Sequence, residues 1–113
     1  MATPAIGTVV LVRFPFSDLS RSKLRPAAVL AAVGRGDYVL CQITSNRYAD
    51  RDAIELRDDH FNRGSLHRIS YVRPGKLFTA NDSLMVREVG ELKPGIRRAI
   101  VDSIEKLLRR SLP

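Results

Sequence analysis

Two apolar runs joined by a short glycine-containing segment constrain the fold of this chain more than any other feature. The runs span residues 25–33 and 38–44, and a Gly-Arg-Gly-Asp segment lies between them. Glycine adopts the positive φ angles of a tight turn at little steric cost, so the pattern predicts an antiparallel β-hairpin. Any fold for this chain has to accommodate that hairpin.

Other short strands are predicted on both sides of the hairpin. Residues 8–14 are rich in β-branched side chains and apolar on both faces apart from Arg13, which predicts a buried strand. Ile54 and Leu56, flanked by charged residues, predict a short edge strand. Polar loops are predicted at residues 15–24 and 57–65. Further strands are predicted at residues 69–73, 77–79 and 84–89, interrupted by Pro74-Gly75 and Asn81-Asp82.

The spacing of apolar residues changes to that of a helix after Pro94. Apolar side chains then recur every three or four residues, at Ile96, Ile100, Ile104, Leu107 and Leu108. Pro94 suits the first turn of a helix, and Arg109 and Arg110 suit the negative end of its dipole. Several short strands and one C-terminal α-helix predict a mainly β fold, a small antiparallel barrel or half-barrel, in one domain over residues 1–113.

The charge balance favours an anionic partner. Nineteen Lys and Arg against twelve Asp and Glu leave a net charge of +7, so nucleic acid is the first candidate. The alternative is that the excess charge is spread over the surface for solubility. A lipid surface is less favoured, because the cations do not gather on one amphipathic segment beside an exposed apolar face.

The chain carries no sign of a metal site, a disulfide or a membrane segment. Its one cysteine, Cys41, cannot form an intramolecular disulfide, and no Cys/His spacing resembles a zinc site, so we expect neither metal nor cofactor. The longest apolar run is far shorter than a membrane helix, and the first residues lack the pattern of a signal peptide. We therefore expect a soluble cytoplasmic protein with no membrane partner.

Arg25 and Thr44 form the first candidate site. If the hairpin turn is centred near residue 35, the two residues lie across from each other at its open end, with Cβ atoms within roughly 4.5 to 8 Å. A guanidinium matches phosphate geometry and can stabilise the charge of a pentavalent transition state, and a threonine adds a hydrogen-bond donor. The alternative is structural: Arg25 lies at a strand edge and Thr44 ends a strand because of its β-propensity.

A second polar cluster contains His67, Arg68, Ser70 and Arg73. If these residues lie on a strand, Arg68 and Ser70 share one face and Arg73 points to the other, so Arg68 is the better phosphate ligand. The alternative is a solvated face. Histidine side chains can act as acids or bases near neutral pH, so His67 is a candidate for that role, but a surface histidine without a catalytic role is favoured.

Three other residues have a weaker claim to function. His60 is interpreted as a surface histidine, and Cys41 as a small core residue rather than a nucleophile. Phe16, at the mouth of the first loop, either stacks on a base or anchors the loop.

The sequence resembles the MazF/PemK family of toxin endoribonucleases along essentially the whole chain. The resemblance rests on three blocks: GTVVLVRFPFSDLSRSKLRPAAVLA, CQITSN, and ISYVRPGKLFTANDSLMVREVGEL followed by the helix. It implies an SH3-like barrel, usually a homodimer, that cleaves single-stranded RNA without metal by attack of the ribose 2′-hydroxyl. It also implies a type II toxin that is inhibited by an acidic antitoxin protein.

The resemblance also implies roles for particular residues. Arg25 matches the arginine of the family's Arg-Pro pair, and Thr44 matches the threonine of its third strand; both belong to the active site. Arg68 matches an arginine that contributes to acid/base chemistry in some relatives, but Ser70 occupies the position of its acidic partner, and serine is a poor general base. RNA contacts are implied at Phe16, Ser17, Arg21, Lys23, Gln42, Ser45, Asn46, His67 and Arg73.

Two alternatives use the same barrel without cleaving RNA. One is a gyrase-inhibiting toxin of the CcdB type, and the other is an RNA-binding module that has lost catalysis. The Arg25 and Thr44 pair favours the enzyme, because a gyrase inhibitor needs neither residue there, whereas Ser70 leaves the inactive binder open.

Overall fold

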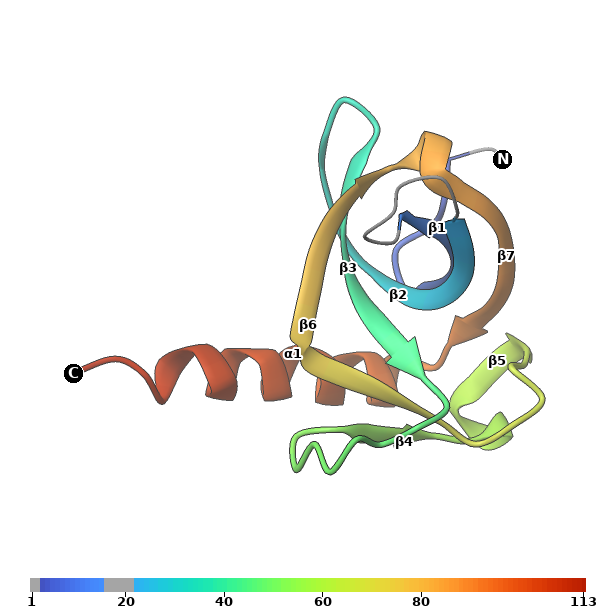
Figure 1. Ribbon diagram of the computed structural model, residues 1–113. Helices are drawn as coiled ribbons and strands as arrows, with labels where there is room; N and C mark the ends of the chain where they lie inside the picture. The colour runs from blue at the N-terminus through green and yellow to red at the C-terminus, as the bar shows by residue number, and fades with distance from the viewer. Residues whose placement is uncertain (1–2, 16–21) are drawn as a thin grey trace.

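The computed structural model describes residues 3–15 and 22–113, and over these residues one curled sheet carries a C-terminal helix. Its seven strands lie in the order β4-β6-β3-β2-β1-β7-β5, and every pairing is antiparallel. Figure 1 shows the strands curling around a common axis, with α1 lying across one side. The strands are β1 (Thr8–Pro15), β2 (Ser22–Gly34), β3 (Asp37–Thr44), β4 (Ile54–Leu56), β5 (Phe61–Gly64), β6 (Ser70–Asn81) and β7 (Met85–Leu92). The predicted mainly β half-barrel is confirmed.

The hairpin of β2 and β3 forms as predicted. Gly34, Arg35 and Gly36 all have positive φ angles, of 99°, 56° and 78°, which is the backbone that the two glycines make accessible. Ala27 pairs with Gln42 near the other end of the hairpin. This register is the one expected for a turn centred near residue 35.

The two faces of the central strands bury two apolar clusters. Val9, Ala28 and Cys41 point to one side and pack with Leu56, Phe61 and Ile100 of the surrounding elements. The alternate side chains point into the curl of the sheet and form the second cluster, which includes Val10, Val12, Ala27, Val29, Leu40 and Met85. Because side chains alternate along a strand, a segment buried on both faces is apolar throughout, which explains the apolar run from Val9 to Val12 in β1.

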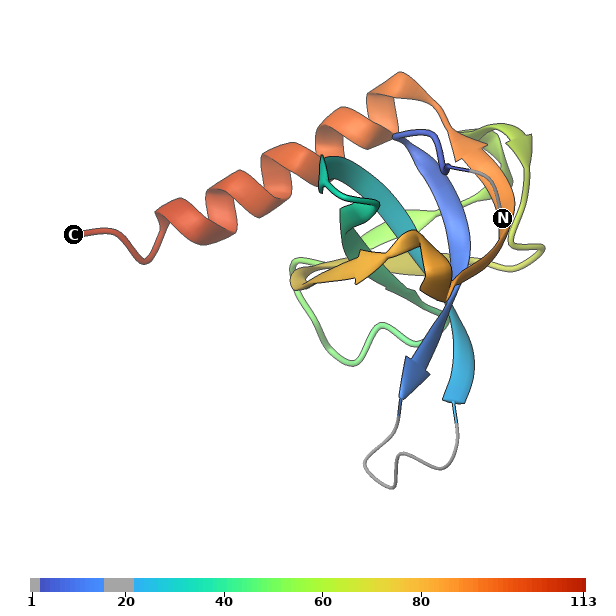
Figure 2. The ribbon, with the colours of Figure 1, turned by 90° about the horizontal axis from the view of Figure 1, so that it is seen from above.

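The helix α1 (Pro94–Arg109) covers the first of these clusters. Ile100 is fully buried in it, and Ile96 and Ile104 pack against its edge. Pro94 occupies the first turn, Arg109 lies in the last turn and Arg110 is the C-cap residue, as predicted, and Lys106 adds a further positive charge to the last turn. Figure 2 shows the C-terminal turns projecting beyond the sheet. Over the described residues, no helix is both long and apolar enough to cross a membrane.

The predicted loop at residues 57–65 is wrong. The segment contains the 3₁₀ helix η1 (Asp58–His60) and strand β5, which pairs with β7. Phe61 is the only residue of β5 that is buried, and the rest of the strand is exposed. An edge strand that buries one side chain has no alternating apolar pattern, so its polar composition predicts a loop.

The predicted break at Pro74-Gly75 is also wrong, because β6 runs through it. The pairing of β6 with β3 is interrupted between Cys41 and Ile43, so Pro74 lies in a bulge where a strand residue needs no N–H donor. The freed carbonyl oxygen of Arg73 accepts a hydrogen bond from the Cys41 thiol at 2.9 Å. Burial raises the pKa of that thiol to about 12, and the charge of Asp50 adds to the effect. Cys41 is the core residue that was predicted.

The first predicted loop is shorter than residues 15–24. Strand β1 extends to Pro15 and β2 begins at Ser22, where these two residues pair. Residues 16–21 lie outside the described residues. The third strand region predicted at 84–89 is β7, which extends to Leu92, and it follows the 3₁₀ helix η2 (Asp82–Leu84).

Candidate functional site

The open end of the β2–β3 hairpin carries Arg25 and Thr44. Ala27 and Gln42 are paired, and Arg25 and Thr44 each lie two residues further along their strands. Since side chains alternate, all four point to the same face. Arg25 is half-buried and is paired on its other side with Val12 of β1. Among the described residues, none forms an ion pair with its guanidinium.

Thr44 is held in place by its own hydroxyl. The side chain is buried, and Thr44 Oγ1 accepts a hydrogen bond from the backbone N–H of Asn46 at 3.1 Å. An oxygen that accepts in this way still has its hydrogen to donate. The geometry therefore leaves Thr44 as a fixed donor at the end of β3.

Thr44 belongs to a row of polar residues that runs across three strands. It pairs with Tyr71 of β6, which pairs in turn with Glu55 of β4. The neighbouring row, Ile43, Val72 and Ile54, belongs to the core. Directly paired residues share a face, so the polar row points away from that core. The pairing thus brings a phenol and a carboxylate into line with Thr44.

Tyr71 and Glu55 were not identified from the sequence as site residues. The carboxylate of Glu55 accepts a hydrogen bond from Arg57 Nε at 2.6 Å, and both side chains are exposed. Glu55 is flanked by apolar residues that predict an edge strand, but its alignment with Thr44 depends on the pairing of β4 with β6. No signal in the sequence gives that register.

Ser70 and Arg68 do not share a strand face as predicted. Strand β6 begins at Ser70, so Arg68 lies in the exposed segment before it. Ser70 is buried, pairs with Leu56 and donates a hydrogen bond from its hydroxyl to the Arg68 carbonyl oxygen at 3.3 Å. It therefore lies on the face opposite the Thr44 row. Arg68 instead borders a pocket of about 420 Å³ with Arg57, Asp58, Asp59, His67 and Ile69.

The two histidines differ in their surroundings. His60 Nδ1 accepts a hydrogen bond from the backbone N–H of Arg57 at 3.0 Å, so the ring caps η1. His67 is exposed, has a φ of 59°, and donates its backbone N–H to Ser65 Oγ at 2.7 Å. Neither ring is brought to the polar row by a described contact.

Arg73 is largely occupied by contacts inside the protein. Its Nε donates to Asp50 Oδ2 at 3.0 Å, and its guanidinium lies 5.2 Å from the centre of the Tyr48 ring. Both partners of the ion pair are mostly buried, with side chains 21% and 16% exposed. This arginine therefore shapes the segment that follows Thr44.

The other residues implied in RNA binding are distributed around the open end of the hairpin. Lys23 is exposed opposite Phe14, and Gln42 is half-buried opposite Ala27. Ser45 and Asn46 are exposed directly after Thr44. Phe16, Ser17 and Arg21 lie outside the described residues.

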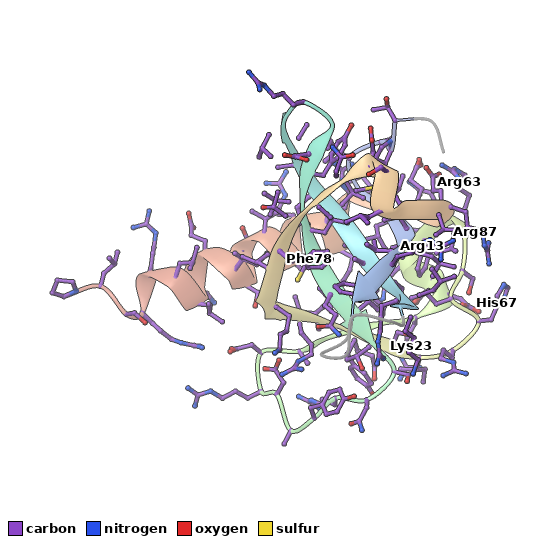
Figure 3. The ribbon with its side chains drawn as sticks, turned by 45° about the horizontal axis from the view of Figure 1, so that its top comes forward. Arg13, Lys23, Arg63, His67, Phe78 and Arg87 are labelled. Atoms are coloured by element: carbon purple, nitrogen blue, oxygen red, sulfur yellow. The ribbon has the colours of Figure 1, made fainter. Side chains whose placement is uncertain are left out.

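Two further exposed arginines, Arg13 and Arg87, lie on the face of the sheet opposite Arg25, because Arg25 pairs with Val12 and Arg13 is the next residue along β1. Arg87 pairs with Leu11, which lies two residues from Arg13 on β1, so both arginines are on one face. Figure 3 shows them with Arg63, which is bound to Glu88. Neither Arg13 nor Arg87 forms an ion pair with another described residue. Arg13 had a signal in the sequence, as the one charged residue of an apolar strand.

The described residues contain no group of three or more His, Cys, Asp or Glu side chains that could hold a metal ion. The positive groups around the hairpin end are arginine and lysine side chains. What this arrangement can do is bind a phosphodiester through Arg25 and Thr44 and present ionisable groups from β6 and β4 beside it.

Comparisons with known proteins agree on the fold. No protein-family model matches the sequence, and no curated protein matches it. Among solved structures, a MazE–MazF complex from Deinococcus radiodurans matches with a TM-score of 0.77 and 18% identity, over 98% of this chain and 100% of that chain. An endoribonuclease in complex with its cognate antitoxin, from a mycobacterial species, matches with a TM-score of 0.71 and 15% identity over the whole of both chains. The Mycobacterium tuberculosis toxin MazF-mt6 matches with a TM-score of 0.70 and 16% identity, over 90% and 96% of the two chains.

Proposed function

We propose that this chain, which has the fold of the MazF toxins, is itself the toxin of a type II toxin–antitoxin system and acts as an endoribonuclease on single-stranded RNA in the cytoplasm. The observation that carries the proposal is the position of Arg25 and Thr44 on one face at the open end of the hairpin. The likeness to solved MazF structures supports it, since the match extends over nearly the whole chain. The domain proposed to do this spans residues 1–113.

In the proposed reaction, Arg25 and Thr44 bind the scissile phosphate. The 2′-oxygen of the preceding ribose attacks phosphorus, so that the 2′-O–P bond forms and the P–O5′ bond breaks. The products are a 2′,3′-cyclic phosphate and a 5′-hydroxyl; the 2′-hydroxyl loses one proton and the 5′-oxygen gains one. Arg25 stabilises the charge that develops on the phosphoryl oxygens, and Thr44 donates a hydrogen bond to one of them.

The proton transfers are assigned to the polar row rather than to Ser70. Ser70 lies on the core face, opposite the row. Glu55 supplies a carboxylate in line with Thr44, and Tyr71 lies between the two. A carboxylate accepts a proton far more readily than a serine hydroxyl does, so Glu55 is the better general base. Arg68, exposed before β6, contributes charge at the edge of the site.

The test is to incubate purified, antitoxin-free protein with a long RNA in EDTA and to map the cut ends. We expect cleavage to persist, because the guanidinium of Arg25 supplies the positive charge in the proposed mechanism. The upstream fragments should carry a 2′,3′-cyclic phosphate and the downstream fragments a 5′-hydroxyl. RNA that is bound and left uncut would favour a non-catalytic binder, and cleavage that stops in EDTA would contradict the mechanism.

An acidic antitoxin is proposed as the regulatory partner. The basic surface around Arg25, Lys23 and Arg68 offers a binding site to a flexible chain that carries carboxylates and a few apolar anchors. Ordering a disordered segment costs free energy, so the bound stretch should be long and partly apolar.

Antitoxin and RNA should exclude each other. Saturating antitoxin peptide should abolish RNA binding, and an uncleavable RNA should weaken peptide binding by the same factor, because linkage is reciprocal. The measurement is a titration of labelled peptide with and without deoxy-substituted RNA, at two salt concentrations. If both ligands bind together with unchanged affinities, the shared surface is the wrong location for inhibition.

A homodimer is also part of the proposal. The C-terminal turns of α1 project beyond the sheet and expose Val101 and Leu108, which are 53% and 59% exposed. Together with Ile104 and Leu112 they line an open apolar pocket of about 440 Å³. A second copy of the chain would cover this surface.

A further inference from the structure

The segment that follows Thr44, residues 45–53, contains two residues in a strained backbone conformation. Tyr48 and Ala49 both have a φ of 55°. This is the left-handed region of backbone conformation, which residues other than glycine, asparagine and aspartate rarely adopt. For an aromatic residue this conformation is unfavourable unless the surroundings enforce it, and such residues cluster at functional sites. Contacts with the surrounding residues must therefore hold Tyr48 in this conformation.

A chain of hydrogen bonds connects Tyr48 to the candidate catalytic threonine. The Tyr48 N–H donates to Asn46 Oδ1 at 2.9 Å, and the Asn46 N–H donates to Thr44 Oγ1 at 3.1 Å. The backbone position of Tyr48 is thus fixed relative to Thr44. Tyr48 follows Thr44 by only four residues, so a ligand bound at Thr44 also lies near the segment that carries the Tyr48 ring.

Further contacts secure the segment from both sides. Arg73 of β6 pairs with Asp50, and Asp52 is bound by both terminal nitrogens of Arg110 at 3.2 and 2.8 Å. The Asp50 N–H donates to the Arg47 carbonyl oxygen at 3.0 Å. With this many fixed groups, the segment is ordered before any ligand arrives, and binding does not have to order it.

The ring that these contacts hold faces solvent. Tyr48 is 57% exposed, although a large apolar ring gains more by packing inside the protein. The Arg73 guanidinium lies over the ring at 5.2 Å, and Arg47 and Arg51 are exposed in the same segment. An exposed aromatic ring among cations is the arrangement with which proteins stack the bases of single-stranded nucleic acid.

We propose that Tyr48 is a stacking platform for a base of the RNA, the one carried by a nucleotide next to the phosphate that Arg25 and Thr44 bind. The proposal rests on the proposed function and adds a specificity-determining residue to it. Arg73 positions the ring, and the strained backbone directs it outward. A stacked base is fixed relative to the scissile phosphate, so Tyr48 contributes to the choice of cleavage site.

The test uses RNA that carries 2-aminopurine at successive positions and a 2′-deoxy substitution at the scissile nucleotide. Stacking quenches 2-aminopurine, so the wild-type protein should quench the probe strongly at one position. Tyr48→Phe should keep the quenching, because it keeps the ring. Tyr48→Asn should abolish it and weaken RNA binding about tenfold, since stacking is worth a factor of that order per base.

Tyr48→Asn also separates stacking from a structural role. Asparagine tolerates a positive φ, so the substitution removes the ring and not the backbone conformation, and the melting temperature should not fall. With cleavable RNA, KM should rise while kcat stays nearly constant. The matched control is Val33→Asn, which replaces a side chain of similar exposure, 56%, at the far end of the hairpin. This control should change neither KM nor kcat.

The outcomes distinguish the two proposals. If the wild-type protein binds and cuts RNA but Tyr48→Asn binds as tightly with unchanged fluorescence, the stacking proposal is overturned and the nuclease stands. If the wild-type protein binds no RNA, both are overturned. If Tyr48→Asn weakens only the antitoxin peptide, the ring is a protein contact and not a base platform.

Discussion

Replacing the 2′-hydroxyl of the scissile nucleotide by hydrogen should abolish cleavage while leaving RNA binding nearly unchanged. The substitution removes the nucleophile of the proposed reaction, and no other group of the substrate can form the cyclic phosphate. In the proposed mechanism Arg25 and Thr44 bind phosphoryl oxygens, which the substitution leaves in place. The expected loss of activity is complete within detection.

The measurement is cleavage of a defined RNA that contains one deoxynucleotide, followed by analysis of the fragments. The matched control carries the deoxynucleotide one position away, and it should be cut at nearly the normal rate. Continued cutting at the substituted position would mean that water or another external nucleophile attacks phosphorus. The proposed roles of Glu55 and Tyr71 would then have to be assigned to activating that nucleophile.

The hairpin could be predicted from the sequence because its determinants are local. The glycines at positions 34 and 36 locate the turn, and apart from two register shifts the turn sets which residues of β2 and β3 face each other. The face shared by Arg25 and Thr44 follows from the pairing of Ala27 with Gln42 and from the alternation of side chains along each strand. The C-terminal helix was predictable for the same reason, since its apolar spacing and Pro94 lie within one segment.

The rest of the sheet depends on contacts between distant segments. Strand β5 buries only Phe61, and it is a strand because β7 supplies its partner. Strand β6 passes through Pro74 because its pairing with β3 is interrupted there and Pro74 lies in the resulting bulge of β6. In both cases the local sequence favours a loop, and tertiary pairing overrides it.

The same dependence explains why the second half of the candidate site was missed. Glu55 and Tyr71 are aligned with Thr44 only by the pairing of β4 with β6 and of β6 with β3. A bulge shifts the register of the β3–β6 pairing. The position of Arg68 was misjudged because β6 begins at Ser70. The ion pair of Arg73 with Asp50 joins residues far apart in the chain, and nothing in either local sequence indicates it.

Arg25→Ala should lower the cleavage rate by roughly 100-fold or more. That factor corresponds to about 3 kcal/mol of transition-state stabilisation, which is typical of losing one electrostatic group at a developing negative charge. The effect should appear mainly in kcat, because the charge on the phosphoryl oxygens grows as the reaction proceeds. Single-turnover cleavage with excess enzyme measures it directly.

Arg25→Lys should recover only part of this loss. Lysine keeps the positive charge, but its ammonium is a point charge without the planar fork that binds two phosphoryl oxygens at once. Circular dichroism and melting curves of both variants serve as the control for folding, and Arg98→Ala, at an exposed site on α1, serves as the control for the loss of one positive charge. That control should cut at close to the normal rate. A folded Arg25→Ala protein with normal turnover would exclude Arg25 from catalysis. The charge stabilisation would then have to come from Arg68, the exposed arginine that lies two residues before the start of β6.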